Sequence, residues 1–390
     1  MAVPTSLLDD TCEVLAELIA FPTVSADSNV ELITYAAEQL GRCGASMTIS
    51  RDETGSKANL FATIGPEGDG GIVLSGHTDV VPAEPDEWTG DPFAMRSSDG
   101  LLFGRGACDM KGFIAAALAT APLFAAKDLK RPVHYAFTYD EEVGCLGARQ
   151  LVGELREAGL RPATAIIGEP TNMRIIEGHK GCYEYTTAFS GLEGHGSLPE
   201  AGVNAVEYAV RYITRLMELG EDLKHRAPAK SRFDPPWTTV QVGRIEGGAA
   251  RNVIAGACSV EWEMRPVHTD DADLVKDDLA RFCAEVLLPQ MRSVSPEASI
   301  DTHVIGEVQG LLPADENEAR EIIAELTGNN HCEVVSFGTE AGLFQGYGMS
   351  VAVCGPGSIE QAHKPDEFVA VEQLDACLAM LTGLADRLER

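Results

Sequence analysis

Seven side chains that are able to bind a metal ion or move a proton lie in short loops next to apolar runs. They are His77, Asp79, Asp109, Glu141, Glu142, Glu169 and His363. Four of the loops follow predicted strands over 72–75, 133–138, 163–167 and 351–354, and the fifth, GRGACDMKG (104–112), precedes a predicted helix. Because the carboxyl ends of strands in an open parallel sheet meet in one crevice, we expect these side chains to converge.

Each of these residues alone has an ordinary structural interpretation. A histidine after a strand is often a hydrogen-bonded loop residue, an aspartate before a helix is often an N-cap, and two adjacent glutamates are usually solvated. Together, however, carboxylates and imidazoles at one point would repel one another or lose solvation unless cations compensate them. The set therefore predicts a metal centre rather than five separate surface loops.

The kinds of ligand in this set indicate which metal ions are suitable. Histidine and carboxylate ligands without cysteine suit zinc, cobalt or manganese. Three carboxylates carry −3 against +4 for two divalent ions, which leaves one positive charge for a hydroxide ion. This charge balance is typical of a hydrolytic site with two divalent metal ions per chain, most simply zinc.

Two pairs of neighbouring residues are expected to divide their roles. Residues two apart on a strand end point the same way, so the Asp79 carboxylate is expected to hold the second ring nitrogen of His77. The adjacent side chains of Glu141 and Glu142 should diverge, so that one binds metal while the other faces the substrate.

The elements that must position these residues alternate between strand and helix patterns in the first third of the chain and again after about residue 310. This alternation predicts an α/β fold, with a mostly parallel sheet and helices on both faces. Between them, the pattern over 180–308 follows the order β-α-β-β-α-β of a split-βαβ, ferredoxin-like domain. We therefore predict a catalytic domain in two parts, 1–179 and 309–390, with an inserted domain between them.

Composition restricts the partners of the protein. The chain has 390 residues and a net charge of −30, which disfavours binding to nucleic acid and to anionic membrane surfaces. No apolar stretch reaches the ~20 residues of a membrane span, and the first residues do not resemble a signal peptide. Ten scattered cysteines without a CxxC pair suit reduced thiols, so we expect a cytoplasmic protein.

Five motifs carry a resemblance to a known family. They are SGHTDVVP (75–82), GRGACDMKG (104–112), TYDEEVG (138–144), GEPT (168–171) and GPGSIEQAHKPDE (355–367). In this order they resemble the dinuclear zinc family of acetylornithine deacetylases, succinyl-diaminopimelate desuccinylases, aminoacylases and related carboxypeptidases. The resemblance implies a zinc-peptidase-like catalytic domain and an inserted lid and dimerisation domain.

The resemblance also assigns roles to residues of the predicted metal centre. It implies that Asp109 bridges the two ions, that His77 and Glu169 complete one site, and that Glu142 and His363 complete the other. It further implies that Glu141 is the general acid and base, that Asp79 orients His77, and that the peptide bond between Asp109 and Met110 is cis.

Further candidates concern the substrate. The resemblance implies a homodimer through the inserted domain, in which His195 contacts the substrate in the partner's active site. Arg251 and Asn252 open a strand after a Gly/Ala loop, where an arginine is able to clamp a carboxylate with two hydrogen bonds; the alternative is a surface arginine. Gly338, Thr339 and Glu340 form a short loop, and Glu340 is a candidate to receive the substrate's side-chain ammonium group.

The resemblance to acetylornithine deacetylases implies a function. The expected reaction is hydrolysis of a small-molecule N-acyl amino acid, N2-acetyl-L-ornithine, to L-ornithine and acetate in arginine biosynthesis. Alternatives are a desuccinylase, an acetylcitrulline deacetylase, an aminoacylase or a dipeptidase, which differ in pocket shape and a few polar contacts. A non-catalytic metal-binding scaffold is an alternative of another class, and loss of Glu141 would be its expected mark. The GRGACDMKG segment lacks the spacing of a phosphate-binding loop, which disfavours a nucleotide site.

Overall fold

The computed structural model describes residues 5–390 and divides them into two compact units. The first, here called the catalytic unit, runs to Gly178 and resumes with Pro313–Val334 and Thr339–Arg390. The second, the inserted unit, comprises His179–Leu312 and Val335–Gly338. The inserted domain predicted over 180–308 corresponds to residues 179–312 of the structure. The sequence did not predict that residues 335–338 also belong to the inserted unit.

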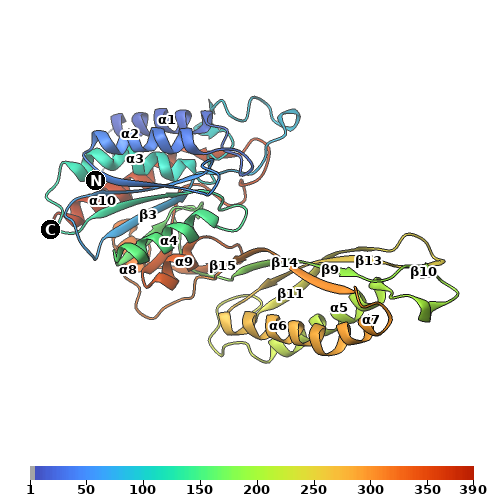
Figure 1. Cartoon of the computed structure of the whole chain (residues 1–390). Helices are drawn as coiled ribbons and strands as arrows, with labels where there is room; N and C mark the ends of the chain where they lie inside the picture. Colours follow the sequence, from blue (N-terminus) through green and yellow to red (C-terminus); the bar gives the residue numbers. More distant parts are fainter. Residues whose placement is uncertain (1–4) are drawn as a thin grey trace. The chain divides into compact units, whose positions relative to one another are not determined.

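An eight-stranded sheet forms the centre of the catalytic unit (Figure 1). In spatial order its strands are β1 (Ser46–Arg51), β2 (Ala58–Ile64), β6 (Val133–Thr138), β3 (Ile72–His77), β7 (Thr164–Ile167), β16 (Ser350–Val353), β8 (Ile175–His179) and β15 (Cys332–Val335). The four central strands β6, β3, β7 and β16 are parallel, while β1, β2 and β8 pair antiparallel. The parallel sheet expected from the sequence is therefore confirmed at the centre.

Helices cover both faces of this sheet, as the α/β prediction requires. They are α1 (Thr5–Ala20), α2 (Val30–Arg42), α3 (Lys111–Ala125), α4 (Leu146–Ala158), α8 (Glu318–Thr327), α9 (Ala341–Tyr347) and α10 (Val371–Leu388). The main core joins α1, α2, α3, α8 and α10 on one face, and Figure 1 shows α4 on the other. The Ala-rich α3 is buried along most of its length, which explains its nearly continuous apolar sequence.

The catalytic unit also contains a smaller sheet, and His363 lies in the loop before its last strand. Strands β4 (Arg96–Ser98), β5 (Leu101–Phe103) and β17 (Phe368–Ala370) form a three-stranded antiparallel sheet, with the short helix η1 (Pro85–Glu87) before it.

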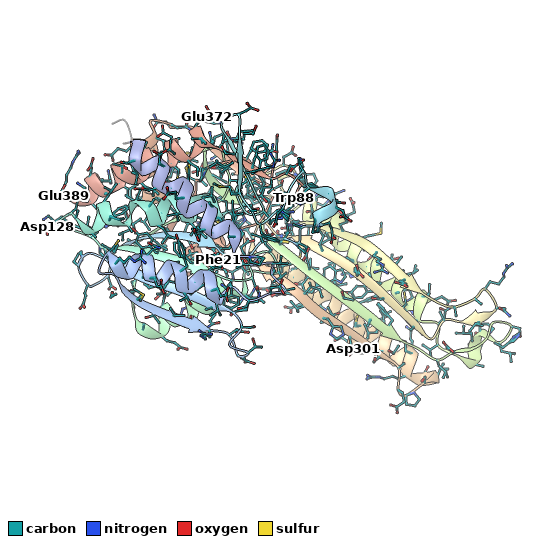
Figure 2. All side chains as sticks on the ribbon, turned by 90° about the horizontal axis from the view of Figure 1, so that it is seen from above. Phe21, Trp88, Asp128, Asp301, Glu372 and Glu389 are labelled. Atoms are coloured by element: carbon teal, nitrogen blue, oxygen red, sulfur yellow. The ribbon has the colours of Figure 1, made fainter. Side chains whose placement is uncertain are left out.

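Phe21, labelled in Figure 2, follows α1 and contacts Tyr35 of α2 with ring centroids 5.8 Å apart. This contact fixes the chain where α1 ends before Pro22.

The inserted unit is a four-stranded antiparallel sheet covered on one face by helices. Its elements are β9 (Cys182–Ser190), β10 (Gly194–His195), η2 (Pro199–Ala201), α5 (Ala205–Lys224), β11 (Thr239–Gly247), β12 (Val253–Ile254), β13 (Ala257–Arg265), α6 (Thr269–Phe282), η3 (Cys283–Leu287), α7 (Leu288–Val294) and β14 (Ser299–Val308). The strand order is β11-β13-β9-β14, and α5 and α6 pack on it through a separate core. The main elements follow the expected β-α-β-β-α-β order.

Some local predictions were wrong. The sequence over 271–287 predicts one continuous helix. In the structure α6 ends at Phe282, and a π-helical turn over Cys283–Leu287 leads into α7. Pro289 lacks the N–H that an α-helix needs at this point, so the hydrogen-bond pattern changes there. The sequence pattern also did not indicate the edge strands β1 and β15, or the buried strand β8, which has only five residues. No helix among residues 5–390 combines the length and apolar character needed to cross a membrane.

Candidate active site

Asp109 lies between two histidines of the catalytic unit. Its Oδ1 is 3.0 Å from Nε2 of His77, and its Oδ2 is 3.4 Å from Nε2 of His363. The peptide bond after Asp109 is cis, as expected, and the N-cap residue of α3 is Met110, not Asp109. A carboxylate that offers one oxygen to each of two imidazoles is arranged to bridge two cations, so the N-cap interpretation does not apply.

Each of the two histidines also lies near a glutamate, His77 near Glu169 and His363 near Glu142. The Oε1 atom of Glu169 is 3.8 Å from Nε2 of His77, and Oε1 of Glu142 is 3.0 Å from Nε2 of His363. Glu169 follows β7, directly after Gly168, where an added Cβ would meet the Phe113 ring at 1.9 Å. Glycine is thus required for the end of β7 to approach α3 and bring Glu169 to the site.

The ring orientation of His77 favours a metal ligand. Its Nδ1 is 2.9 Å from the main-chain oxygen of Asp79, which only accepts hydrogen bonds. Nδ1 therefore carries a proton, and in a neutral ring the lone pair is on Nε2, the atom that faces Asp109 and Glu169. Burial lowers the pKa of His77, but its hydrogen bonds with Asp109 and Asp79 raise that pKa well above its usual value. A metal ion at Nε2 would replace the proton that these carboxylates otherwise hold there, so the residues present fit a metal ion.

Electrostatics support the same conclusion. Burial raises the pKa of Glu169 well above its usual value, and burial also raises the pKa of Glu142. The pKa of His363 is raised to about 10 by its hydrogen bonds with Asp109 and Glu142. Without cations the buried carboxylates thus compete for protons, and bound divalent ions would supply the missing positive charge.

Asp79 acts differently from the sequence-based prediction. Its carboxylate is 3.6 Å from Nδ1 of His77, and the shorter contact to this ring is made by its main-chain oxygen. The carboxylate instead accepts hydrogen bonds from the backbone N–H groups of Glu141 and Glu142, at 3.0 and 3.3 Å, and from Ser25 at 2.7 Å. Asp79 therefore orients His77 through the backbone and uses its side chain to hold the loop after β6.

Sequence reasoning missed a lysine that holds the same loop. The Lys57 ammonium group donates to Asp140 at 2.7 Å and to the main-chain oxygen of Ser25 at 2.6 Å. Lys57 and Asp140 are both buried. A buried charge next to the Asp-Glu-Glu motif requires a partner, and Lys57, directly before the apolar strand β2, supplies it.

Glu141 lies close to the first half of the centre. Ligand atoms of His77, Glu141 and Glu169 all lie within 4.8 Å of one another, and so do those of His77, Asp109 and Glu142. Burial raises the pKa of Glu141 well above its usual value. The geometry alone therefore allows Glu141 either to bind an ion or to face a reacting water, and a variant must separate the two roles.

The segment Gly338-Thr339-Glu340 crosses from the inserted unit to the catalytic unit. Glu340 is fully buried, and its two oxygens accept hydrogen bonds from Ser75 at 2.5 Å and Thr138 at 2.8 Å. In this conformation neither oxygen faces solvent, so the prediction that Glu340 receives a substrate ammonium group does not fit the structure. Thr339 is also buried, and its hydroxyl accepts from the N–H of Ala341 at the start of α9.

The remaining three candidates lie together in the inserted unit. His195 of β10 pairs with Val253 of β12, and the N–H of Gly196 donates to the oxygen of Asn252 at 2.8 Å. Arg251 precedes Asn252 in the same turn, and the side chains of all three candidates, His195, Arg251 and Asn252, are exposed. The structure thus brings an imidazole, a guanidinium and an amide to one end of this unit, although His195 and Arg251 are 56 positions apart in the sequence.

Comparison with known proteins identifies the family. Residues 73–387 match the model of peptidase family M20/M25/M40. The chain belongs to this family. It is 39% identical over 373 residues to an acetylornithine deacetylase of Myxococcus xanthus, with 94% of each chain covered. It is 34% identical over 379 residues to the acetylornithine deacetylase of Pasteurella multocida, covering 95% of this chain and 96% of the relative. The protein is a metal-dependent amide hydrolase, which agrees with the predicted chemistry.

Solved structures share the fold. An M20 metallo-carboxypeptidase of Sulfolobus solfataricus superposes with a TM-score of 0.74 at 17% identity, covering 98% of this chain and 99% of that chain. A dinuclear metal-binding M20 peptidase of Bacillus subtilis gives a TM-score of 0.64 at 18% identity, with 98% of each chain covered. The predicted fold class is confirmed by these structures.

Separate alanine variants distinguish the roles of Glu141 and Glu142. Glu142→Ala should weaken binding of one ion at least ~10-fold, because it removes a carboxylate that contacts His363. Glu141→Ala should keep two ions while the catalytic rate falls ~10²-fold, the usual effect of removing a general base. Metal titration and steady-state kinetics measure both effects, with Glu157→Ala on the exposed face of α4 as the control. Metal loss in Glu141→Ala alone would reverse the assignment.

Proposed function

We propose that the protein removes the acetyl group from N2-acetyl-L-ornithine with two divalent metal ions, releasing L-ornithine and acetate. The position of Asp109 between His77 and His363 is the observation that carries the two-metal proposal. The proposed substrate is supported by 34–39% identity to acetylornithine deacetylases over most of the chain. The reaction would serve arginine biosynthesis in the cytoplasm, where the free thiols of all ten cysteines would be stable.

Five residues would hold the metal ions in this proposal. His77 and Glu169 would bind one ion, Glu142 and His363 the other, and Asp109 both. Zinc is the proposed metal, and cobalt and manganese suit the same ligands. Bound ions of this kind polarise an amide carbonyl and make water a better nucleophile near neutral pH.

Glu141 is the proposed general base and acid. It takes a proton from the attacking water, whose oxygen joins the acetyl carbon, and returns that proton to the nitrogen as the carbon–nitrogen bond breaks. The products are therefore acetate and the free α-amine of ornithine. The position of Glu141 beside His77 and Glu169 supports this role, and the Asp79 carboxylate supports it further by holding its backbone.

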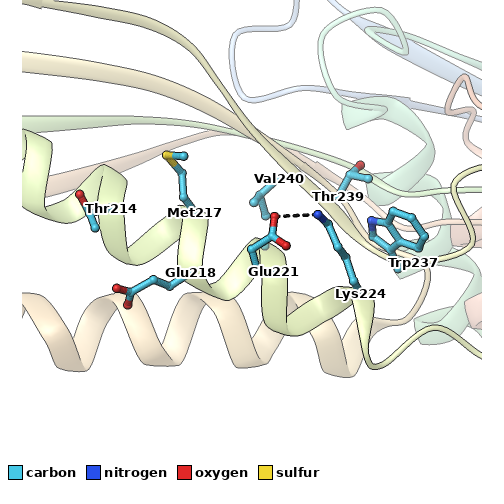
Figure 3. Close-up of a pocket in the computed structure, with 9 residues that line it drawn as sticks. Thr214, Met217, Glu218, Glu221, Lys224, Trp237, Thr239 and Val240 are labelled. Carbon is cyan, nitrogen blue, oxygen red and sulfur yellow. Dashed lines mark hydrogen bonds and ion pairs between the residues drawn. The ribbon is translucent and has the colours of Figure 1, made fainter.

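The inserted unit is proposed to bind a second copy of the chain along α5 and β11. β11 is an edge strand, and a groove of about 600 Å³ lies between it and α5 (Figure 3). Val210, Thr214 and Met217 form a stripe on α5, and Val210 and Met217 are 51% and 64% exposed. Apolar side chains beside an unpaired strand edge suit a symmetric contact between two copies.

Such a dimer would let the inserted unit of one copy complete the active site of the other. We propose that His195 contacts the reacting carbonyl there, while Arg251 and Asn252 bind the substrate carboxylate. The clustering of these three exposed residues at one end of the inserted unit supports this proposal. Within residues 5–390, none of the structure's ion pairs engages Arg251, so its guanidinium is available to a carboxylate.

Substrate comparison tests the proposed reaction. Metal-reconstituted protein should hydrolyse N2-acetyl-L-ornithine with a higher kcat/KM than acetylcitrulline, acetylmethionine or succinyl-diaminopimelate, by at least ~10-fold, since a charged side chain adds specific contacts. Steady-state kinetics with all four compounds measures the ratio, and Glu141→Ala controls for contaminating hydrolases. A higher kcat/KM for any of the other three would assign the protein to a different member of the family.

Subunit exchange tests the dimer. His195→Ala and Glu141→Ala should each be nearly inactive, but a mixture should regain part of the activity, because a mixed dimer contains one site with both residues intact. Exchange is followed independently by mass spectrometry of differently tagged chains. Full exchange without any return of activity would show that His195 does not act across an interface.

A further inference from the structure

A buried glutamate outside the predicted site holds the loop that carries Asp109. The Glu367 carboxylate accepts hydrogen bonds from three donors of this loop, the backbone N–H groups of Gly106 at 3.0 Å, Cys108 at 2.8 Å and Asp109 at 3.0 Å. Glu367 is 1% exposed. The orientation of the Asp109 backbone therefore depends directly on this carboxylate.

Arg105 joins this contact to two other segments of the centre. Its guanidinium group pairs with Glu367 at 2.8 Å and also donates to the main-chain oxygens of Pro82 at 3.1 Å and Lys364 at 3.4 Å. Pro82 belongs to the segment that begins with His77, and Lys364 follows His363 directly. Arg105 is 3% exposed, and the ring of Trp88, labelled in Figure 2, lies 5.1 Å from the carbon of its guanidinium group.

One ion pair thus connects three segments that are distant in the sequence. The planar guanidinium group presents several N–H donors in a fixed arrangement, so a single arginine is able to hold two carbonyls and a carboxylate at once. The two carbonyls belong to the segments of His77 and His363, and the carboxylate also binds the backbone N–H of Asp109. The side chains of His77, Asp109 and His363 face one another at the centre of the site.

We propose that the Arg105–Glu367 ion pair positions the metal ligands, so that its integrity determines the affinity of both ions. The inference rests on the metal centre of the proposed function but not on the identity of the substrate. Asp109 faces both histidines, and a shift of its backbone therefore changes both halves of the centre. Neither Arg105 nor Glu367 touches the reacting atoms, which makes them positioning residues rather than catalytic ones.

Another arginine–glutamate pair of the catalytic unit, with a buried glutamate and a partly exposed arginine, provides a comparison. Arg320 donates to Glu177 of β8 at 2.8 Å, and Glu177 is 3% exposed. This pair joins β8 to α8, and neither element carries a predicted metal ligand. If Glu367 had only a structural role, replacing it by glutamine would lower stability without changing metal binding, as is expected for Glu177.

The test compares Glu367→Gln with Glu177→Gln. Each variant is titrated with zinc against a chelating indicator, its visible absorption is recorded after cobalt substitution, and its unfolding is followed with denaturant. Glu367→Gln should weaken the binding of both ions by about 10–100-fold and change the cobalt spectrum, the usual effect of removing a residue that orients metal ligands. Glu177→Gln should unfold more easily while its zinc affinity and cobalt spectrum stay at wild-type values.

Arg105→Lys gives a second and milder variant, which keeps the positive charge beside Glu367. Because an ammonium group cannot reach all three acceptors in the arrangement of a guanidinium, this variant should also weaken both ions and change the cobalt spectrum. Wild-type zinc affinity and cobalt spectra in Arg105→Lys and in any folded Glu367→Gln would overturn the proposal. A wild-type protein that binds two ions but does not cleave acetylornithine would contradict the proposed substrate alone.

Discussion

The contact of one buried carboxylate with two imidazoles is the constraint on which the rest of the site depends. Asp109 presents one oxygen to His77 and the other to His363. Asp109 and His77 are buried, so little water screens their charges, whereas the side chain of His363 is about half-exposed. Two more carboxylates, those of Glu142 and Glu169, lie against the same histidines. Such an arrangement is stable only with protons or cations between the groups, and cations are what a hydrolytic centre uses.

The fold brings these groups together by a simple geometric means. The parallel strands β3, β6, β7 and β16 end at one edge of the sheet, so loops from distant parts of the sequence meet there. Strands alone do not fix the positions of the loops, which are held by hydrogen bonds with buried charged side chains. Asp79 holds the loop of Glu141 and Glu142, Lys57 holds Asp140, and Glu367 holds the loop of Asp109.

The sequence predicted the ligand types and their meeting place well, because strand periodicity and the chemistry of His, Asp and Glu are both visible in it. It predicted the supporting contacts poorly. Asp79 was expected to bond a ring nitrogen through its carboxylate, but that carboxylate bonds backbone N–H groups, which carry no residue-specific signal. The charge of Glu340 and its place in a loop favour a substrate contact, whereas the structure buries it against Ser75 and Thr138. The π-helical turn before Pro289 was missed because local helix propensity continues across it.

The most direct measurement of the central claim is anomalous X-ray scattering at the zinc absorption edge, from crystals grown with zinc. The two-metal account predicts two strong peaks per chain, both next to Asp109, one beside His77 and Glu169 and the other beside Glu142 and His363. Data collected on both sides of the edge separate zinc from other scatterers. A single peak at saturating zinc, or two peaks of which one lies away from Asp109, would contradict the account.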